Sequence, residues 1–378
     1  MYKFLIVILF FASICSCDTK DSYEIIKVNF NSIENNNISI TVDKLIPLET
    51  SDSSFVGTIT KLRYLNGKFF VFDIIHKRTV TCFNSKGDFM FSIPFGKGPG
   101  ELIMADDFDV FDRTLYIKSH HEIHQYNLED GMYKKSLQYT EHFNKFSFLD
   151  SKHLITFGYS PSINDLKKYS HDIKMLENNI SLYKIIDLNE KMESMTFLNG
   201  KFHFSTFLPA DPVSKYGDNI LCLYPPYNKI YNYNGQNMEL KYMVDFGSFS
   251  FRNDELNSDI YNCINLIREG ERAGLIDYII ETRDFITFGF LKQIGHNSYN
   301  IYSKSSHNSA LLEDIVSENF LTRMSILSAF ENKLLCILDP SVLDDFQINE
   351  LNEKYHLNPL ITNSSNPIIV IAKIYEKK

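Results

Sequence analysis

The sequence is poor in the features that mark several classes of protein. Its 378 residues include six cysteines but no Cys-x-x-Cys pair, which argues against a zinc site or a disulfide-stapled scaffold. Basic side chains number 38 against 47 acidic ones, so the chain lacks the basic surface that non-specific nucleic-acid binding requires. The sequence also contains no P-loop, dinucleotide fingerprint, nucleophile elbow or kinase motif set.

Aromatic and aliphatic residues are plentiful by contrast. The chain has 31 Phe and 22 Tyr but no Trp, and hydrophobic residues make up 44% of it against 22% charged ones. This composition can bury a sizeable core, which excludes global disorder. The length suits either two ordinary domains or one large array of repeats. Four cysteines are expected to be small buried hydrophobes, namely Cys82, Cys222, Cys263 and Cys336.

The N-terminus carries the pattern of a secretory signal. Lys3 precedes an apolar stretch from Phe4 to Ile14, which is too short to span a bilayer because a spanning helix needs about 20 apolar residues. No later part of the sequence shows a run that would span a membrane. We therefore assign residues 1–16 to a signal peptide.

Cys17 follows this stretch, with the small residue Ser16 directly before it. The arrangement resembles the lipobox of bacterial lipoproteins, in which the cysteine thiol is the acyl acceptor. Cys15 is the poorer acceptor because the bulky Ile14 precedes it, and Ile14 also stands where a lipobox usually has Leu. The resemblance implies a lipid anchor at Cys17, a linker through residues 17–37, and a place in the envelope of a Gram-negative bacterium, at the outer membrane. An ordinary cleaved signal with a spare thiol is the alternative.

Short strand-like runs separated by turn residues fill most of the remaining chain. The clearest unit comprises Thr58–Tyr64, Phe69–Asp73, Thr79–Phe83 and Asp88–Ile93, with glycine-containing turns that suit tight hairpins. Its third run recurs at intervals of about 40–70 residues, and propeller blades repeat with periods of about 40–50. The markers of this recurrence are Phe83, Tyr126, Ile186, Tyr233 and Tyr302.

The first and last strand-like runs predict a closed ring. Ile38–Ile46 has no partner nearby, and pairing it with a last sheet built from Met324–Phe330, Lys333–Leu338 and Ile368–Ile374 would protect the sheet edges. We therefore predict an all-β fold over residues 38–378, a six-bladed β-propeller of four-stranded antiparallel blades with short helical inserts.

Three inserts interrupt the repeats and are the best candidates for a specialised surface. Residues 161–180 and 339–367 are polar, and the second of these is partly helical. Residues 251–278 carry an apolar stripe that predicts a helix, either packed on the sheets or docking a partner. The stripe consists of Leu256, Ile260, Cys263, Ile264 and Ile267.

Both ends of the repeated region resemble the six-bladed β-propeller lipoproteins related to the NHL-repeat family. The segments that carry the resemblance are Ile46–Thr50, Asn66–Asp73, Phe83–Phe89, Phe95–Glu101 and Asn366–Val370. It implies the same fold but little about activity, because propellers host many functions. Asp73 resembles the blade aspartate of that family and is expected to accept hydrogen bonds from nearby turn amides.

A glycine-rich run follows the first unit, formed by Gly96, Gly98, Pro99, Gly100 and Glu101. A phosphate-binding loop would need a following helix with its amides facing the anion, whereas Leu102–Phe111 reads as a strand. Pro99 also removes one amide donor. We interpret the run as a connection between two blades, with glycines that supply unusual φ angles.

Two sets of residues are candidate metal ligands. Asp107 and Asp109 lie where the innermost strand of the second blade should begin and share one of its faces, so they could point into the channel and bind Ca²⁺. His120, Glu122 and His124 would share one face of a strand and could bind Zn²⁺. The favoured interpretations are structural: turn caps for the aspartates, and solvated or edge-strand histidines. No other cofactor is expected.

These features together predict a lipid-anchored, non-catalytic binding or scaffolding propeller of the cell envelope. Its connecting loops would contact a protein, peptide or glycan, and nucleic acid is not an expected partner. The alternative is a metal-dependent NHL-like hydrolase or lyase that uses Asp107, Asp109 and the histidines in the propeller channel. A sensory partner for a membrane transport or signalling system is a third possibility.

Overall fold

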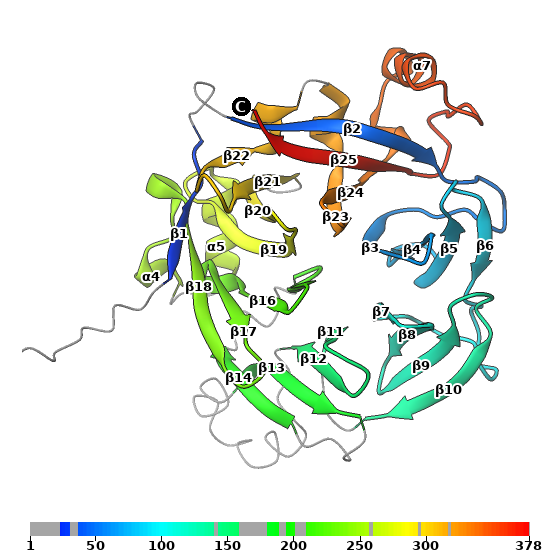
Figure 1. Ribbon diagram of the computed structural model, residues 1–378, viewed down its shortest axis with the longest axis horizontal. Coiled ribbons are helices and arrows are strands. Elements are labelled where there is room, and N and C mark those ends of the chain that lie inside the picture. The colour runs from blue at the N-terminus through cyan, green and yellow to red at the C-terminus, as the bar shows by residue number, and fades with distance from the viewer. Residues whose placement is uncertain are drawn as a thin grey trace, which may run out of the picture.

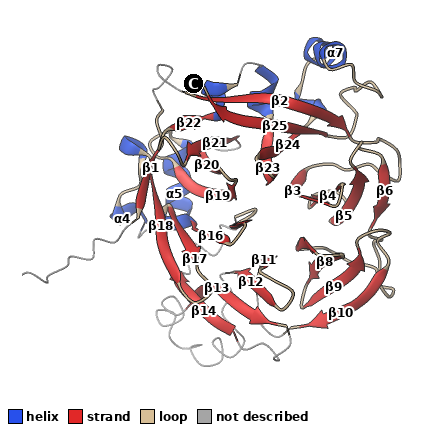
Figure 2. Cartoon of the chain, viewed as in Figure 1, coloured by secondary structure: helices blue, strands red, loops and turns tan. Residues whose placement is uncertain are grey.

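The computed structural model is a ring of six β-sheets around a central axis (Figure 1). It describes residues 23–30, 37–139, 143–158, 180–188, 194–200, 209–256, 260–293, 296–316 and 319–377. Strands build the ring and helices lie at its margin (Figure 2). The predicted six-bladed β-propeller is confirmed. The predicted signal peptide and Cys17 lie outside the described residues, and no helix within them is long and apolar enough to cross a membrane.

Each blade is an antiparallel meander whose first strand lines the axis. From the axis outward, blade 1 contains β3 (Ile59–Leu65), β4 (Lys68–Asp73), β5 (Thr79–Asn84) and β6 (Phe89–Ser92). Blade 2 contains β7 (Asp107–Phe111), β8 (Thr114–Ser119), β9 (Glu122–Asn127) and β10 (Tyr133–Gln138). Blade 3 contains β11 (Lys145–Phe148), β12 (His153–Phe157), β13 (Ile180–Asp187) and β14 (Ser194–Gly200).

The second half of the ring repeats this plan. Blade 4 contains β15 (Val213–Tyr216), β16 (Asn219–Tyr224), β17 (Lys229–Tyr233) and β18 (Met238–Asp245). Blade 5 contains β19 (Gly274–Glu281), β20 (Phe285–Gln293), β21 (His296–Ser303) and β22 (Ser309–Leu311). Blade 6 contains β23 (Ser325–Phe330), β24 (Lys333–Leu338), β25 (Ile368–Glu376) and, at the rim, β2 (Ile38–Pro47). All five marker residues fall on third strands.

The two ends of the propeller region close the ring. β2 pairs antiparallel with β25, in a register that runs from Ile38 opposite Glu376 to Pro47 opposite Ile368. The last blade therefore takes its outermost strand from the start of the region and its other three from the end. This confirms the predicted closure, which removes two free sheet edges.

Blade 4 has a fifth strand that the sequence analysis missed. β1 (Glu24–Lys27) pairs parallel with β18, so residues that we assigned to the 17–37 linker belong to the propeller. The reason is burial: Ile26 and Val28 alternate toward the core and are almost wholly buried, while Ile25 between them is 47% exposed. Phe30 continues the alternation and packs against Phe246, Phe249 and Phe290.

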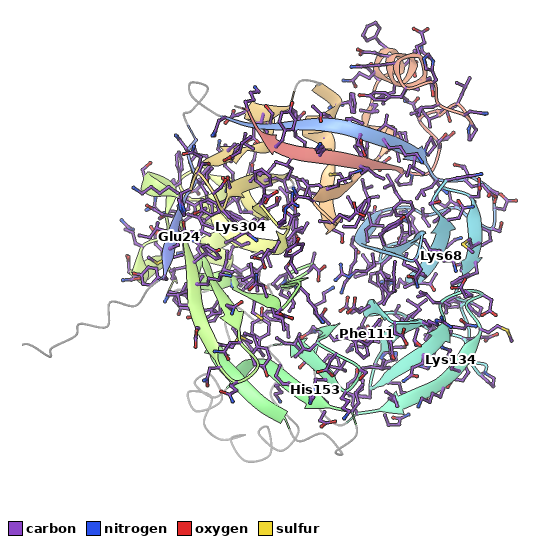
Figure 3. All side chains as sticks on the ribbon, viewed as in Figure 1. Glu24, Lys68, Phe111, Lys134, His153 and Lys304 are labelled. Carbon is purple, nitrogen blue, oxygen red and sulfur yellow. The ribbon has the colours of Figure 1, made fainter. Side chains whose placement is uncertain are left out.

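Apolar side chains fill the spaces between neighbouring blades (Figure 3). Each sheet is covered on both faces, and every residue of β4 is accordingly buried. Aromatic pairs cross several of the boundaries between blades. The ring centroids of Phe72 in blade 1 and Phe108 in blade 2 lie 6.0 Å apart, and those of Tyr64 in blade 1 and Phe330 in blade 6 lie 4.7 Å apart. The expected burial of four free cysteines is also confirmed, at positions Cys82, Cys222, Cys263 and Cys336.

The two faces of the ring differ in their connections. Because strands alternate in direction, the turns after first and third strands emerge on one face, where the longest connection is 188–193. We call this the short-turn face. Connections after second and fourth strands emerge on the opposite face and include 93–106, 246–273 and 339–367. We call this the long-connection face.

The helices are short and most occur in the long connections. In the described part of the chain they are η2 (Pro225–Tyr227), η3 (Gly247–Phe249), α4 (Asn253–Leu256), α5 (Ile260–Arg268), α6 (Leu312–Ile315), η4 (Asn319–Arg323), η5 (Pro340–Val342) and α7 (Asp345–Lys354). The helical insert is shorter than the predicted 251–278, because β19 already begins at Gly274. Its stripe packs on the blades through Ile260, Cys263 and Ile267, as one of our two interpretations expects. The predicted insert 161–180 lies outside the described residues except at Ile180, where β13 begins.

Candidate functional site

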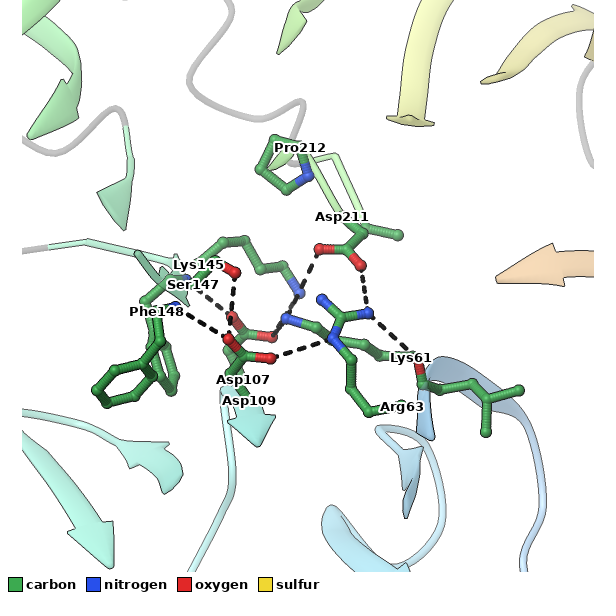
Figure 4. Close-up of polar contacts among 12 residues, drawn as sticks. Lys61, Arg63, Asp107, Asp109, Lys145, Ser147, Phe148, Asp211 and Pro212 are labelled. Atoms are coloured by element: carbon green, nitrogen blue, oxygen red, sulfur yellow. Dashed lines mark hydrogen bonds and ion pairs between the residues drawn. The ribbon is translucent and has the colours of Figure 1, made fainter. Parts of the chain in front are cut away.

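Two cations of blade 1 face two carboxylates of blade 2 inside the channel. Lys61 and Arg63 are two residues apart on β3, and Asp107 and Asp109 are two residues apart on β7, so each pair shares one face of its strand. Lys61 Nζ lies 2.9 Å from Asp107 Oδ1, and Arg63 Nε donates to Asp109 Oδ1 over 3.1 Å (Figure 4). Charge-assisted hydrogen bonds therefore tie the two innermost strands together.

The second oxygen of each aspartate reaches the next blade. Asp107 Oδ2 accepts a hydrogen bond from the Phe146 amide at 2.9 Å. Asp109 Oδ2 accepts from the Phe148 amide at 3.0 Å and from the Ser147 hydroxyl at 3.1 Å. Each aspartate thus links three consecutive blades, a wider role than the turn caps that we expected.

Asp211 completes the cluster from across the channel. It precedes β15, and its Oδ2 lies 2.6 Å from Arg63 Nη1 while its Oδ1 lies 3.7 Å from Lys61 Nζ. Lys145 on β11 adds a third cation, with its Nζ 3.9 Å from Asp107 Oδ1. Three cations therefore meet three carboxylates, and the charges of the cluster balance.

Burial and charge act in opposite directions on these groups. Burial by itself would raise the pKa of Asp211, but Arg63 and Lys61 outweigh it and hold that pKa below its ordinary value. Burial would likewise lower the pKa of Arg63, whereas Asp211 and Asp109 raise it above its ordinary value. Both residues are consequently charged at neutral pH, and each depends on the other to remain so while buried.

The cluster lies between two cavities of the channel. Lys61 is 2% exposed and Asp107 is fully buried, so these two groups are shielded from water. The lower cavity, at the short-turn end, has a volume of about 220 Å³ and is lined by residues of all six innermost strands, Arg63, Asp109 and Glu281 among them. The upper cavity, at the long-connection end, has a volume of about 720 Å³.

The upper cavity combines charged, aromatic and apolar groups. Its lining includes Arg78, Met104, His120, His121, Lys145 and Asp277. Lys145 therefore belongs both to the ionic cluster and to the floor of this cavity. Burial raises the pKa of Asp277 above its ordinary value, although the Ala210 amide, 2.8 Å from Oδ1, opposes the shift.

The structure separates the five candidate metal ligands. Asp107 and Asp109 lie in the channel cluster, whereas His120 lies in the turn between β8 and β9 with a φ of 50°. His124 lies on β9, with its Nε2 3.2 Å from Glu122 Oε2 and its ring beside Tyr126. The expected shared strand face therefore holds for Glu122 and His124 but not for His120. Nowhere in the described ranges do three or more His, Cys, Asp or Glu side chains gather as a metal site.

The turn that holds His120 is fixed by a neighbouring carboxylate. Asp106 Oδ2 accepts hydrogen bonds from Lys118 Nζ at 2.6 Å and from the His120 amide at 3.0 Å. We expected a strand over Leu102–Phe111, but β7 begins only at Asp107. The residues just before it, up to Asp106, instead cross the rim of the upper cavity.

Two other sequence expectations are confirmed. Asp73 Oδ1 accepts hydrogen bonds from the Ile75 and His76 amides at 3.0 and 2.9 Å, and its Oδ2 accepts from the Gly57 amide at 2.8 Å. The glycine-rich run connects blades 1 and 2. Within it Glu101 Oε2 accepts from the Gly98 amide at 2.8 Å, and a Cβ at Gly96 would meet that same carboxylate oxygen at 1.9 Å.

The cations of the cluster were not among the site residues predicted from the sequence. Lys61 and Arg63 stand two residues apart in a run that we had identified as a strand, a spacing that Asp107 and Asp109 repeat one blade later. Matching these two patterns would have predicted the ion pairs between the side chains of β3 and β7. Asp211 gives no such signal, because it stands outside any strand-like run.

Comparisons with known proteins agree with this architecture. A family model described as Domain of unknown function (DUF4934) matches residues 25–373. Among solved structures, a presumed exported protein from Bacteroides fragilis is similar, with 18% identity, a TM-score of 0.70, and coverage of 93% of this chain and 100% of that one. At this identity the likeness concerns the fold alone.

Two further structures match more weakly. U3-55K has 11% identity, a TM-score of 0.45, and coverage of 88% of this chain and 98% of its own. The β-propeller domain of Cps50 (Swd1) from Myceliophteria thermophila has 8% identity, a TM-score of 0.41, and coverage of 76% and 96%. The comparison with curated proteins found no match.

Proposed function

This chain belongs to the DUF4934 family, and we propose that it is a lipid-anchored, non-catalytic binding propeller of the cell envelope. The anchor is Cys17, preceded by an apolar signal and by Ser16. The resemblance to NHL-related propeller lipoproteins supports this location. The Bacteroides fragilis protein that shares this fold is itself described as exported, which agrees with this location.

The observation that carries the binding role is the upper cavity. Its volume of about 720 Å³ falls within the range of about 300–1,000 Å³ in which ligand pockets are found. It opens on the long-connection face, so residues from several blades can contact one ligand. Its floor includes Lys145 of the ionic cluster, and this cluster ties the surrounding innermost strands together.

The ion pairs and hydrogen bonds that Asp107 and Asp109 already make support a role without metal catalysis. Lys61 and Arg63 already neutralise these carboxylates, and the Phe146 and Phe148 amides occupy their remaining oxygens. A metal ion at this place would have to displace both cations. The carboxylates are therefore structural groups of the channel.

The charges at the upper mouth favour an anionic ligand. Arg78 is exposed at the cavity and contacts Met104 Sδ at 3.1 Å, and no carboxylate of the described residues forms an ion pair with it. Lys145 approaches its nearest carboxylate only to 3.9 Å. The Arg78 guanidinium at the cavity suits a ligand that bears carboxylates, such as an acidic glycan or an acidic peptide.

The test uses the purified mature protein on arrays of acidic and neutral oligosaccharides and peptides. Arg78→Ala should weaken binding of the acidic ligands by about tenfold, which corresponds to about 1.4 kcal/mol. The matched control is Arg113→Ala, an exposed arginine in the β7–β8 turn on the opposite face. Unchanged binding by Arg78→Ala, a preference for neutral ligands, or chemical turnover of the bound ligand would each contradict the proposal.

A further inference from the structure

The N-terminal strand shows from which face of the ring a tether would leave. β1 pairs parallel with β18, in a register that runs from Glu24 opposite Tyr242 to Lys27 opposite Asp245. As the fourth strand of its blade, β18 runs from the short-turn face toward the long-connection face. β1 therefore runs the same way, and the chain before Glu24 approaches from the side of the short turns.

A contact to the next blade supports this direction. The Glu24 carboxylate bonds to the Tyr302 hydroxyl and to His307 Nδ1. His307 belongs to the turn between β21 and β22, which emerges on the short-turn face. Figure 3 places Glu24 at the outer side of the ring, close to Lys304 of the same turn.

We infer that the protein sits on the membrane with its short-turn face toward the lipid and its upper cavity directed away from it. The inference rests on the proposed lipidation of Cys17. Only residues 18–23 separate that cysteine from β1. Since an extended chain spans at most about 3.3–3.6 Å per residue, the tether reaches no more than about 25 Å.

The fold disfavours the inverted orientation. To bring the long-connection face to the lipid, the tether would have to turn back and run the height of blade 4. Segment 246–273 stands at that end of the same blade, with Phe246 and Phe249 packed on Phe30. Helices α4 and α5 would then lie between the tether and the bilayer.

The two faces also differ in what they could present to a flat bilayer. Among the described residues, the turns of the short-turn face contain two to five residues, so this face can approach a flat surface closely. The long-connection face carries most of the exposed large hydrophobic side chains of loops, including Ile75, Phe95 and Phe346. With the short turns against the lipid, the upper cavity stays open to ligands that arrive from the aqueous side.

The experiment measures which face lies near the lipid. A fluorophore is introduced through a non-natural amino acid at Asp218, in the β15–β16 turn, or at Ile75 on the long-connection face. Both positions are exposed. The protein is bound to vesicles of phosphatidylethanolamine and phosphatidylglycerol that contain headgroup spin-labelled lipid, and quenching is compared with that in unlabelled vesicles.

Two forms of the protein separate this inference from the proposed anchor. One is the mature protein purified from cells, whose flotation with vesicles tests native lipidation. The other begins at Cys17 and carries a maleimide-coupled lipid on that residue, so its orientation is measured whether or not the cell acylates it. In the second form, we expect several-fold stronger quenching at position 218 than at position 75. Equal quenching or the reverse order would overturn the inference.

A longer tether provides the matching control. Insertion of about 40 Gly and Ser residues before Tyr23 gives a segment with an end-to-end distance of about 35 Å, enough for the propeller to reorient. The difference between positions 218 and 75 should then shrink toward none. A difference that persists would show that the face binds lipid by itself and that the short tether does not set the orientation.

Discussion

Arg63 on β3 and Asp211 before β15 meet across the central channel, with 2.6 Å between Nη1 and Oδ2. This contact joins blade 1 to the start of blade 4, on the far side of the ring. Arg63 also holds Asp109 of blade 2, so one guanidinium links three blades. The planar fork of arginine suits this role, whereas a lysine ammonium would present a single point charge.

Lys61→Met should strongly destabilise the protein. The substitution removes the nearest cation of the fully buried Asp107 carboxylate and leaves only the more distant Lys145, and removing one partner of a buried ion pair costs about 3–5 kcal/mol. Urea unfolding followed by circular dichroism measures the loss. The double variant Lys61→Met/Asp107→Asn removes both charges and should recover part of it. The control is Lys134→Met, which replaces an exposed lysine. An equal loss of unfolding free energy in Lys61→Met and Lys134→Met would contradict a buried ion pair between Lys61 and Asp107.

Acid should weaken the contribution of Asp211. Its folded-state pKa lies below the ordinary value, so the stability that it supplies is fully present above about pH 4 and is lost as the pH falls through the folded-state pKa. Asp211→Asn removes this pH dependence. The difference in urea midpoint between wild type and Asp211→Asn should therefore be larger at pH 6 than at pH 3. A constant difference across this range would refute the assignment.

Asp73→Ala should destabilise blade 1 through the backbone. Three amides, those of Gly57, Ile75 and His76, lose their acceptor, and we expect a cost of about 3 kcal/mol. The matched control is Asp130→Ala, which removes an exposed turn carboxylate that accepts from the Met132 amide. Thermal unfolding of both variants gives the comparison, and the prediction fails if Asp73→Ala melts no earlier than the control.

Local patterns explain why most of the fold could be predicted from the sequence. Strand alternation and glycine-containing turns are read within a few residues, and the unpaired run at Ile38–Ile46 indicated how the ring closes. β1 was missed because it is short and follows the predicted anchor. Its alternation of Ile26, Val28 and Phe30 was nevertheless present in the sequence.

The channel cluster was harder to predict because its partners are distant in sequence. Lys61 and Asp107 are 46 positions apart, and nothing in either strand alone shows that the two faces meet. The aspartates without their cations suggested a metal site. A ring places successive innermost strands side by side. Comparing the spacing of the charged residues on these strands would therefore have predicted ion pairs in place of a metal site.

Two neighbouring isoleucines test whether β1 belongs to the propeller. Ile26 is fully buried, so Ile26→Ala should cost about 2–5 kcal/mol. Ile25 is 47% exposed, and Ile25→Ala should change stability by less than about 0.5 kcal/mol. Urea unfolding of the two variants under identical conditions measures the contrast. If residues 17–37 were a free linker, both substitutions would be neutral.

The four buried cysteines should be unreactive in the folded protein. Burial raises the pKa of the Cys82 thiol to about 12 and raises those of Cys222 and Cys336 as well, so at pH 8 almost none of these thiols is present as the reactive thiolate. Ellman's reagent added to the chain from residue 18 onward should release little colour until urea unfolds it, and then react with all four thiols. The control is Asp218→Cys, whose exposed thiol should react at once. Rapid reaction of a native cysteine at pH 8 would mean that its blade opens to solvent, because burial is what suppresses the thiolate.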